Sequence, residues 1–231
     1  VTGGNPSNIS GMIQTTGFGN ANLFLMNPAG IVFGPNAALN VGGSVSFTTA
    51  DYLRLTDGTH FNALPGPADA SVSSAPVAAF GFLGSNPAAI TLLGSQLAVS
   101  EGQTISLVGG DVTIEGPSDT LQPAYNLAAP GGQLTLASVA SPGEILSSNQ
   151  QSEPNINGQS FTNMGNISLS GGSTLDTSAD AAGTVQIRGG RLVMANATIS
   201  ADTGSTAGTA TAINILVTGD LSITAHTDPA L

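Results

Sequence analysis

The sequence contains no cysteine, no tryptophan and no lysine among its 231 residues. Without cysteine the chain has no disulfide, no thiolate metal site and no cysteine nucleophile. Only 3 basic side chains stand against 14 acidic ones, so the formal net charge is -11. This scarcity of cations argues against nucleic acid and anionic membrane surfaces as partners. Charged residues make up 7% of the chain and hydrophobic residues 40%, which is typical of a folded protein with a neutral, polar surface.

Neither end of the sequence resembles a natural terminus. The chain starts at Val1 without a basic and apolar signal segment, and it stops soon after a strand-like run. We therefore expect a piece of a longer chain. The longest uncharged stretch, residues 70–100, contains Pro76 and Pro87 and alternates apolar with polar residues, so we predict no membrane span there.

Hydrophobic residues alternate with polar ones in short runs along most of the chain. Glycine-containing breaks such as Gly109-Gly110 separate these runs, and no run shows the spacing of a helix face. Glycine at this density would also cost a helix about 1 kcal/mol per residue. The runs predict short strands, which begin at Leu23, Ile31, Ala38, Ser44, Ile90, Leu97, Ile105, Val112, Ile167, Val185, Leu192, Ala197, Ile213 and Leu221.

The strand pattern repeats after about three strands. Ile90 and Val112 lie 22 positions apart, Leu23 and Ser44 lie 21 apart, and the motif I-S-L-V-G-G recurs in altered form further along the chain. Such a repeat predicts an all-β, right-handed parallel β-helix with three strands per coil, about ten coils and a stack of about 50 Å. The rival architecture, an antiparallel sandwich, would need Asn-Gly or Asp-Gly hairpins between its strands. Asp57-Gly58 is a single case.

Two polar segments interrupt this rhythm, at residues 62–76 and 147–163. Both are rich in Pro, Ser or Asn, and the strand pattern resumes after each. We interpret them as loop excursions from the stack rather than as linkers between domains. Residues 77–146 and 164–231 are then β-helix coils, and the last of these repeats is expected to continue beyond the fragment.

The titratable residues predict no catalytic, cofactor or metal site. His60 and His226 are far apart in the sequence, and neither accompanies a serine nucleophile motif. Asp111 and Glu115 share one outward strand face, but four residues of strand separate them by about 13 Å. Glycoside hydrolysis needs carboxyl groups about 5 to 10 Å apart. Carboxylates from adjacent coils remain an open alternative.

A second acidic pair resembles a calcium loop only faintly. Asp176 and Asp180 occur in D-T-S-A-D-A-A-G, but Ala181 stands where such a loop needs glycine and Ile187 where it needs glutamate. We interpret this segment as a solvated loop.

Two longer motifs near the start are more specific. One is N-P-S-N-I-S-G over residues 5–11, and the other is L-F-L-M-N-P-A-G-I-V-F-G from Leu23 onward. Together they resemble the filamentous haemagglutinin N-terminal domain, the secretion domain of large bacterial exoproteins exported by two-partner secretion. The hallmark N-P-N-G-I of that family stands here with Ala29 at its third position. Later segments from Gly84 and Leu127 are similar to the same group, so the resemblance covers essentially the whole chain.

The resemblance implies a non-enzymatic secretion and adhesion module without a cofactor. Residues 1–61 would be the C-terminal part of the secretion domain, because the family normally has further strands and a cap upstream. The implied partner is an outer-membrane β-barrel transporter with periplasmic domains. The implied location is outside the cell or on its surface, where a host or neighbouring cell surface or a carbohydrate could be bound. Absence of cysteine suits a chain that crosses the periplasm unfolded.

The motif residues themselves have two interpretations. Asn followed by Pro and then Gly favours a rigid turn between two buried strands, which is a purely structural role. The resemblance implies instead that the transporter reads the motif, for example by β-augmentation of strand edges in the unfolded chain. The candidate residues are Asn5, Pro6, Ser7, Asn27, Pro28, Gly30 and Ile31.

Two classes of function follow from the sequence. The first is the secretion and adhesion module. The second is a carbohydrate-active β-helix enzyme, a polysaccharide hydrolase or lyase, which would need an acidic cluster across coils. Low charge, the lack of lysine and the scattered histidines favour the first.

Overall fold

The computed structural model of this protein describes residues 1, 4–66, 69, 73–117, 125–147, 161–204 and 213–225. Within these residues the regular elements are β-strands, and none of the described chain forms a helix with the length and hydropathy of a membrane span. Short alternating runs broken by glycine do not sustain helical turns, but they suit extended strands. The predicted all-β class is confirmed.

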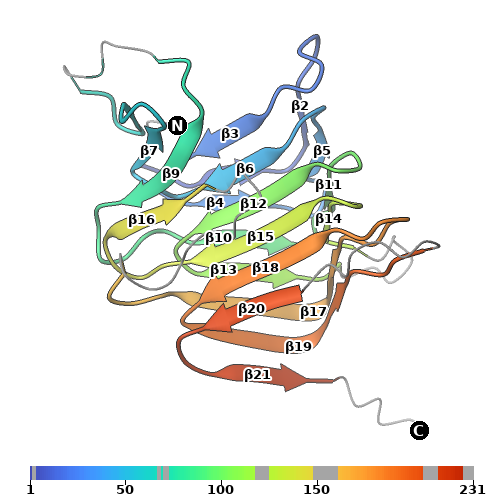
Figure 1. The fold of residues 1–231 in the computed structure, drawn as a ribbon. Helices are drawn as coiled ribbons and strands as arrows, with labels where there is room; N and C mark the ends of the chain where they lie inside the picture. Colours follow the sequence, from blue (N-terminus) through green and yellow to red (C-terminus); the bar gives the residue numbers. More distant parts are fainter. Residues whose placement is uncertain are drawn as a thin grey trace, which may run out of the picture.

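Parallel strands stack into three faces that run along the molecule (Figure 1). The first face contains β1 (Ser7–Ile9), β4 (Ile31–Phe33), β10 (Ile90–Leu93), β13 (Val112–Glu115), the first halves of β17 (Asn166–Asp176) and β19 (Arg191–Ser200), and β21 (Leu221–Thr224). The second contains β2 (Met12–Gln14), β5 (Ala38–Asn40), β11 (Leu97–Ala98), β14 (Leu127–Ala128) and the second halves of β17 and β19. The third contains β3 (Leu23–Met26), β6 (Val45–Thr48), β12 (Thr104–Gly109), β15 (Gln133–Ser138), β18 (Thr184–Gly189) and β20 (Ile213–Val217).

The register along these faces follows the sequence repeat. Ile90 lies opposite Ile31 on one side and opposite Val112 on the other, so the predicted repeat of 22 positions is confirmed. Leu23 lies opposite Val45 rather than Ser44, which makes that repeat 22 positions instead of 21. Mostly parallel pairing in this order is consistent with the predicted β-helix.

Each turn of the stack uses more residues on average than the sequence repeat suggested. The third face has six strands in the described part of the chain, whereas even division of the sequence predicted about ten coils. Val45 and Ile105, which are neighbours on this face, are 60 positions apart, and Leu134 and Val185 are 51 apart. Between the two residues of each pair, part of the chain leaves the stack. The residues of that part, which include β7 to β9 in the first case and β16 in the second, add no coil.

Segments that leave the stack, mostly outside the two predicted loop excursions, form a sheet of their own. This fourth sheet is antiparallel, with the strand order β16-β9-β7-β8. Its strands are β7 (Tyr52–Leu55), β8 (His60–Asn62), β9 (Val77–Phe82) and β16 (Gly143–Leu146). The β9 and β16 segments were predicted to lie within the coils, because short apolar runs such as V-A-A-F-G-F occur in parallel and antiparallel strands alike.

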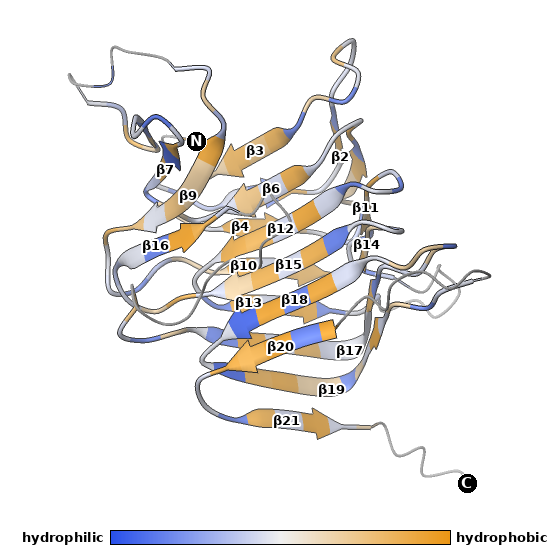
Figure 2. Ribbon diagram, viewed as in Figure 1, coloured by the Kyte–Doolittle hydropathy of each residue, from blue (hydrophilic) through white to orange (hydrophobic). Residues whose placement is uncertain are grey.

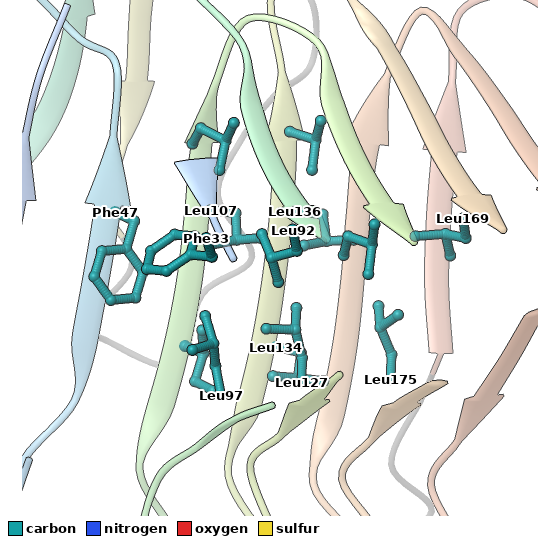
Figure 3. Close-up of a cluster of buried hydrophobic side chains, with 14 of the residues drawn as sticks. Phe33, Phe47, Leu92, Leu97, Leu107, Leu127, Leu134, Leu136, Leu169 and Leu175 are labelled. Carbon is teal, nitrogen blue, oxygen red and sulfur yellow. The ribbon is translucent and has the colours of Figure 1, made fainter. Parts of the chain in front are cut away.

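The core fills the space between the three faces. In Figure 3, buried side chains from successive coils lie in rows, with Phe33, Leu92 and Leu169 from the first face. The rings of Phe33 and Phe47 pack edge to face, with their centroids 4.8 Å apart. Each coil therefore covers the apolar layer of its neighbours, as inward positions of period two require.

Candidate functional site

The two Asn-Pro motifs meet at one corner of the stack. Residues 5 and 6 lead into β1, and residues 27–30 connect β3 to β4. Because β1 and β4 pair in parallel with Ser7 opposite Ile31, the two motifs lie in adjacent coils. All seven motif residues predicted from the sequence are therefore brought together. Their sequence separation alone did not establish this, since it depends on the register.

Asn27 is the central polar residue of this corner, and its side chain is fully buried. Its Nδ2 donates to the Asn5 carbonyl oxygen (3.1 Å) and to the Ser7 Oγ (2.8 Å). Its Oδ1 accepts a hydrogen bond from the Ala29 N–H at 3.0 Å. Both amide protons and the amide oxygen are thus satisfied, which is what burial of a polar group demands.

The backbone of the same segment forms the turn that the sequence predicted. The Gly30 N–H donates to the Asn27 carbonyl oxygen at 3.0 Å, and the Gly30 carbonyl accepts from the Ser7 N–H at 2.9 Å. Gly30 has a φ of 116°, which L-amino acids with side chains rarely adopt. A Cβ there would also lie 3.3 Å from the Ala89 carbonyl oxygen of the next coil.

Exposure differs among the motif residues. Asn27, Gly30 and Ile31 are buried, Ser7 and Pro28 are half-buried, and the Asn5-Pro6 pair is exposed. In the folded protein a partner therefore has direct access to the outer part of this corner and not to Asn27. The geometry supports the structural role of the turn. A partner protein could contact the buried motif residues only in an unfolded chain.

The next coil repeats the motif without its contacts. Residues 86–90 read N-P-A-A-I, and Ile90 pairs with Ile31, so Asn86 is the positional equivalent of Asn27. Asn86 is exposed, whereas Asn27 is buried. The difference follows from the coil before: Asn5 and Ser7 supply acceptors for Asn27. Position 86 offers a matched control for substitutions at position 27.

The acidic residues considered for catalysis are engaged separately. The Asp111 carboxylate accepts from the Asn166 N–H at 2.8 Å and lies at a corner between coils. The Asp176 carboxylate accepts from the Ser178 N–H at 2.9 Å, in a local turn. Among the described residues no three His, Asp or Glu side chains gather where they could hold a metal ion. His226 lies outside the described residues, as do residues 148–160 of the second predicted excursion.

A polar cluster on the fourth sheet was not found from the sequence. Glu144 of β16 forms an ion pair with Arg54 of β7, with Arg54 Nη2 2.8 Å from Glu144 Oε2. The Tyr52 hydroxyl donates to the same carboxylate at 2.9 Å. These residues are about 90 positions apart in the chain, and only the antiparallel pairing of β9 with both β7 and β16 brings them together. No local motif could have indicated this.

The charges of this cluster stabilise one another. The hydrogen bonds from Arg54 hold the pKa of the Glu144 carboxyl below its usual value, and the same contact raises the pKa of Arg54. Burial, together with the hydrogen bond to Glu144, raises the pKa of Tyr52 to about 12. The Tyr52 ring stacks on His60 with centroids 4.3 Å apart. With these shifts Glu144 and Arg54 stay charged and Tyr52 stays neutral at neutral pH, so the three groups hold strands together and are not poised for proton transfer.

A known protein family matches the part of the chain that contains the two Asn-Pro motifs. Neither the curated proteins nor the solved structures include a match to this chain. The family described as the TPS secretion domain matches residues 1–189, which include both Asn-Pro motifs and the strands from β1 to β18. That match covers most of the chain and bears out the resemblance drawn from the motifs. This chain belongs to the TPS, or two-partner secretion, domain family.

Proposed function

We propose that this chain is a non-enzymatic secretion and adhesion module of a large exoprotein, exported through a partner outer-membrane β-barrel transporter. The observation that carries the proposal is the corner where Asn5-Pro6-Ser7 and the turn from Asn27 to Ile31 interlock, within a chain that belongs to the secretion domain family. Membership of that family supports export across the outer membrane as part of a secreted exoprotein.

The periplasmic domains of the transporter read the motif residues before the chain folds. Asn27 and Ile31 are fully buried once the coils have stacked, so a folded chain would hide them. In an extended chain the same residues expose backbone N–H and C=O groups and can pair with a strand edge of the partner. The residues proposed for this recognition are Asn5, Pro6, Ser7, Asn27, Pro28, Gly30 and Ile31.

Outside the cell the coils form a stack that presents neutral polar rows. On the outer side of the third face, Ser46 lies opposite Ser106, which lies opposite Thr135. Such a surface suits display of the stack at the cell exterior and contact with a host or neighbouring cell surface or a carbohydrate. We propose a right-handed winding, because parallel strands joined by crossovers are almost always right-handed.

The enzyme alternative has no observation in its favour among the described residues. Asp111 and Asp176 are hydrogen-bonded to different backbone groups at different corners. A hydrolase would need a proton donor and a second carboxylate at one scissile bond.

The first experiment compares export of the chain, within its exoprotein, from cells with and without the partner transporter. We expect the protein in the medium only when the transporter is present. Equal amounts in the medium without the transporter would overturn the proposed route.

The second experiment measures binding to the isolated periplasmic domains, with the chain either folded or freshly diluted from urea. We expect the unfolded chain to bind at least about tenfold more tightly than the folded chain, and Asn27→Ala to weaken the unfolded chain while Asn86→Ala does not. If unfolded Asn27→Ala binds like the natural sequence, the motif is a structural turn and the recognition proposal is wrong.

A further inference from the structure

The fourth sheet runs alongside the stack and spans several of its turns. β7 directly follows β6, β9 directly precedes β10, and β16 directly follows β15. On the third face the corresponding order is β6-β12-β15, so β7 and β16 leave the stack at strands that are not neighbours. In Figure 1 the labels β7, β9 and β16 lie together beside that face. Because β9 pairs with both β7 and β16, the fourth sheet links the coil of β6 to the coil of β15.

A second hydrophobic core fastens this sheet to the stack. Outward positions of the third face are polar over much of their length, but Met26, Val108 and Ala137 form a mostly apolar row, interrupted by the buried Thr48. Figure 2 shows hydrophobic segments on β9 and β16. The buried members of this core are Met26, Ala50, Leu53, Ala63, Phe80, Phe82, Val108, Ala137, Val139, Ile145 and Phe161. They come from β3, β12 and β15 of the stack, from β7, β9 and β16 of the fourth sheet, and from residues next to these strands.

Polar contacts close the same sheet on its outer side. Arg54 and Tyr52 of β7 reach across β9 to Glu144 of β16. They do so over Gly81, where a Cβ would collide with the ring of Tyr52. Glycine at this position thus leaves room for the aromatic ring to lie flat across the middle strand and to reach the carboxylate.

The order along the chain makes β16 the last strand to arrive. β7, β8 and β9 can form a three-stranded sheet as soon as residue 82 is available, but β9 then has one unpaired edge. Residues 83–142, which contain β10 to β15, must be placed before Glu144 can reach Arg54. In an ordinary solenoid each coil contacts only its neighbours, and coils can open one at a time.

We propose that the fourth sheet is a brace, closed by β16, that makes the part of the stack from β3 to β15 open as one cooperative unit. This role in export rests on the proposed secretion function: a chain that emerges from its N-terminal end acquires the brace only after β15, and the closed brace opposes unfolding back into the transporter. The brace itself is a property of the folded chain and can be tested without the transporter.

The test is hydrogen exchange measured on the purified full chain, with Gly81→Ala as the variant that opens the brace. The added methyl displaces Tyr52 and separates β7 from β16. We expect amide exchange in β6, β12 and β15 to rise together by at least about tenfold, while exchange in β18 stays within about twofold of the natural sequence.

A milder pair of variants tests the closing contact. Arg54→Gln and Glu144→Gln should each raise exchange in β9 and β12 by about two- to fivefold, because the pair is partly exposed to water. The double variant should add little to either single one, since both remove the same contact. Asp180→Asn, which removes an equal charge at an exposed position, serves as the control.

The brace is overturned if Gly81→Ala raises exchange only in β7, β8, β9 and β16 and leaves β6, β12 and β15 unchanged. That result would mean that the fourth sheet does not couple the coils, which then open one at a time as in an ordinary solenoid. Because these measurements use folded protein in buffer, they stand whether or not the export assay detects a partner. A failed export assay with intact cooperative protection would therefore count against the secretion route alone.

Discussion

At the residue scale, buried polar groups decide how the coils fit together. Asn27 has no contact with solvent, yet it links three backbone or side-chain groups from two coils. Removing a partner from a buried hydrogen bond costs more than the bond itself contributes, because the group left behind is neither paired nor hydrated. Stability of the first turns of the stack therefore depends strongly on this one amide.

Asn27→Ala tests this dependence. We expect a loss of about 1 to 2 kcal/mol in the free energy of unfolding, since the Asn5 carbonyl and the Ala29 N–H lose a partner in a partly buried site. Asn86→Ala, at the equivalent exposed position, should change it by less than about 0.5 kcal/mol. Urea unfolding followed by circular dichroism measures both. Equal losses for the two variants would contradict the assigned role of Asn27.

Glu144 introduces a pH dependence that belongs to the fourth sheet. Its carboxyl faces Arg54 and Tyr52 of β7 and is also influenced by His60 of β8, and the Arg54 contact lowers its pKa from the usual value of 4.5. A lowered carboxyl pKa stabilises the folded state above the unfolded-state pKa, and this contribution disappears as pH falls through the folded-state pKa. Because the pair is partly exposed, the contribution amounts to about 1 kcal/mol or less.

We therefore expect Glu144→Gln to be less stable than the natural sequence at pH 7 and nearly equal to it at about pH 3. Unfolding midpoints between these two values of pH measure the difference, with Asp180→Asn as the control. A difference between the natural sequence and Glu144→Gln that stays constant across this range would show that the ion pair contributes nothing to stability.

At the element scale, the motif I-S-L-x-G-G occurs at residues 105–110 and again at 167–172, and its last glycine has a different role at each place. Gly110 follows β12, and its N–H donates to the Ala88 carbonyl at 3.0 Å, so the backbones of two coils nearly touch. Gly172 occupies the same place in the repeat at Ile167, inside β17, where the chain bends between two faces. There the requirement is a φ of 80°, and no atom crowds the position at closer than 4.0 Å.

Substitution with alanine should distinguish these two corners. Gly110→Ala would drive its methyl into the Pro87 carbonyl, so we expect a loss of about 3 kcal/mol or more in the free energy of unfolding. Gly172→Ala meets only backbone strain and should lose about 1 to 2 kcal/mol. Thermal unfolding of both variants provides the comparison. The reverse order of losses would show that φ, and not the distance between coils, limits this motif.

At the scale of the whole molecule, stability comes from the continuous apolar row inside the stack. Leu107 lies between Phe47 and Leu136 in register and is fully buried. Its methyl groups contact side chains from the coils before and after, so a cavity at this place weakens both interfaces at once.

Leu107→Ala should lower the free energy of unfolding by about 2 to 5 kcal/mol. Leu93→Ala, at a position that is 41% exposed, should lower it by less than about 1 kcal/mol. If coils β3 to β15 open together, Leu107→Ala shifts the whole transition and keeps one unfolding step. Two separate steps in the fluorescence and circular dichroism curves would instead mean that the coils at this level open by themselves.

The strand period, the 22-residue repeat and the family can all be predicted from local sequence patterns. Side chains at inward positions must be apolar every second residue, so runs such as the one at Ile90 show their class without tertiary information. The Asn27-Pro28 turn was also readable, because proline and glycine restrict φ locally. These properties depend on residues that are close together in the chain.

Which segments share a sheet depends instead on tertiary packing. β9 and β16 are short runs with buried apolar residues, as coil strands are, and nothing local specifies their antiparallel pairing rather than the parallel pairing of β10 or β13. Likewise, the burial of Asn27 and the exposure of Asn86 arise from the coil that precedes each. Register and contacts between residues 20 to 90 positions apart depend on how the whole stack packs, and a one-dimensional pattern does not contain that information.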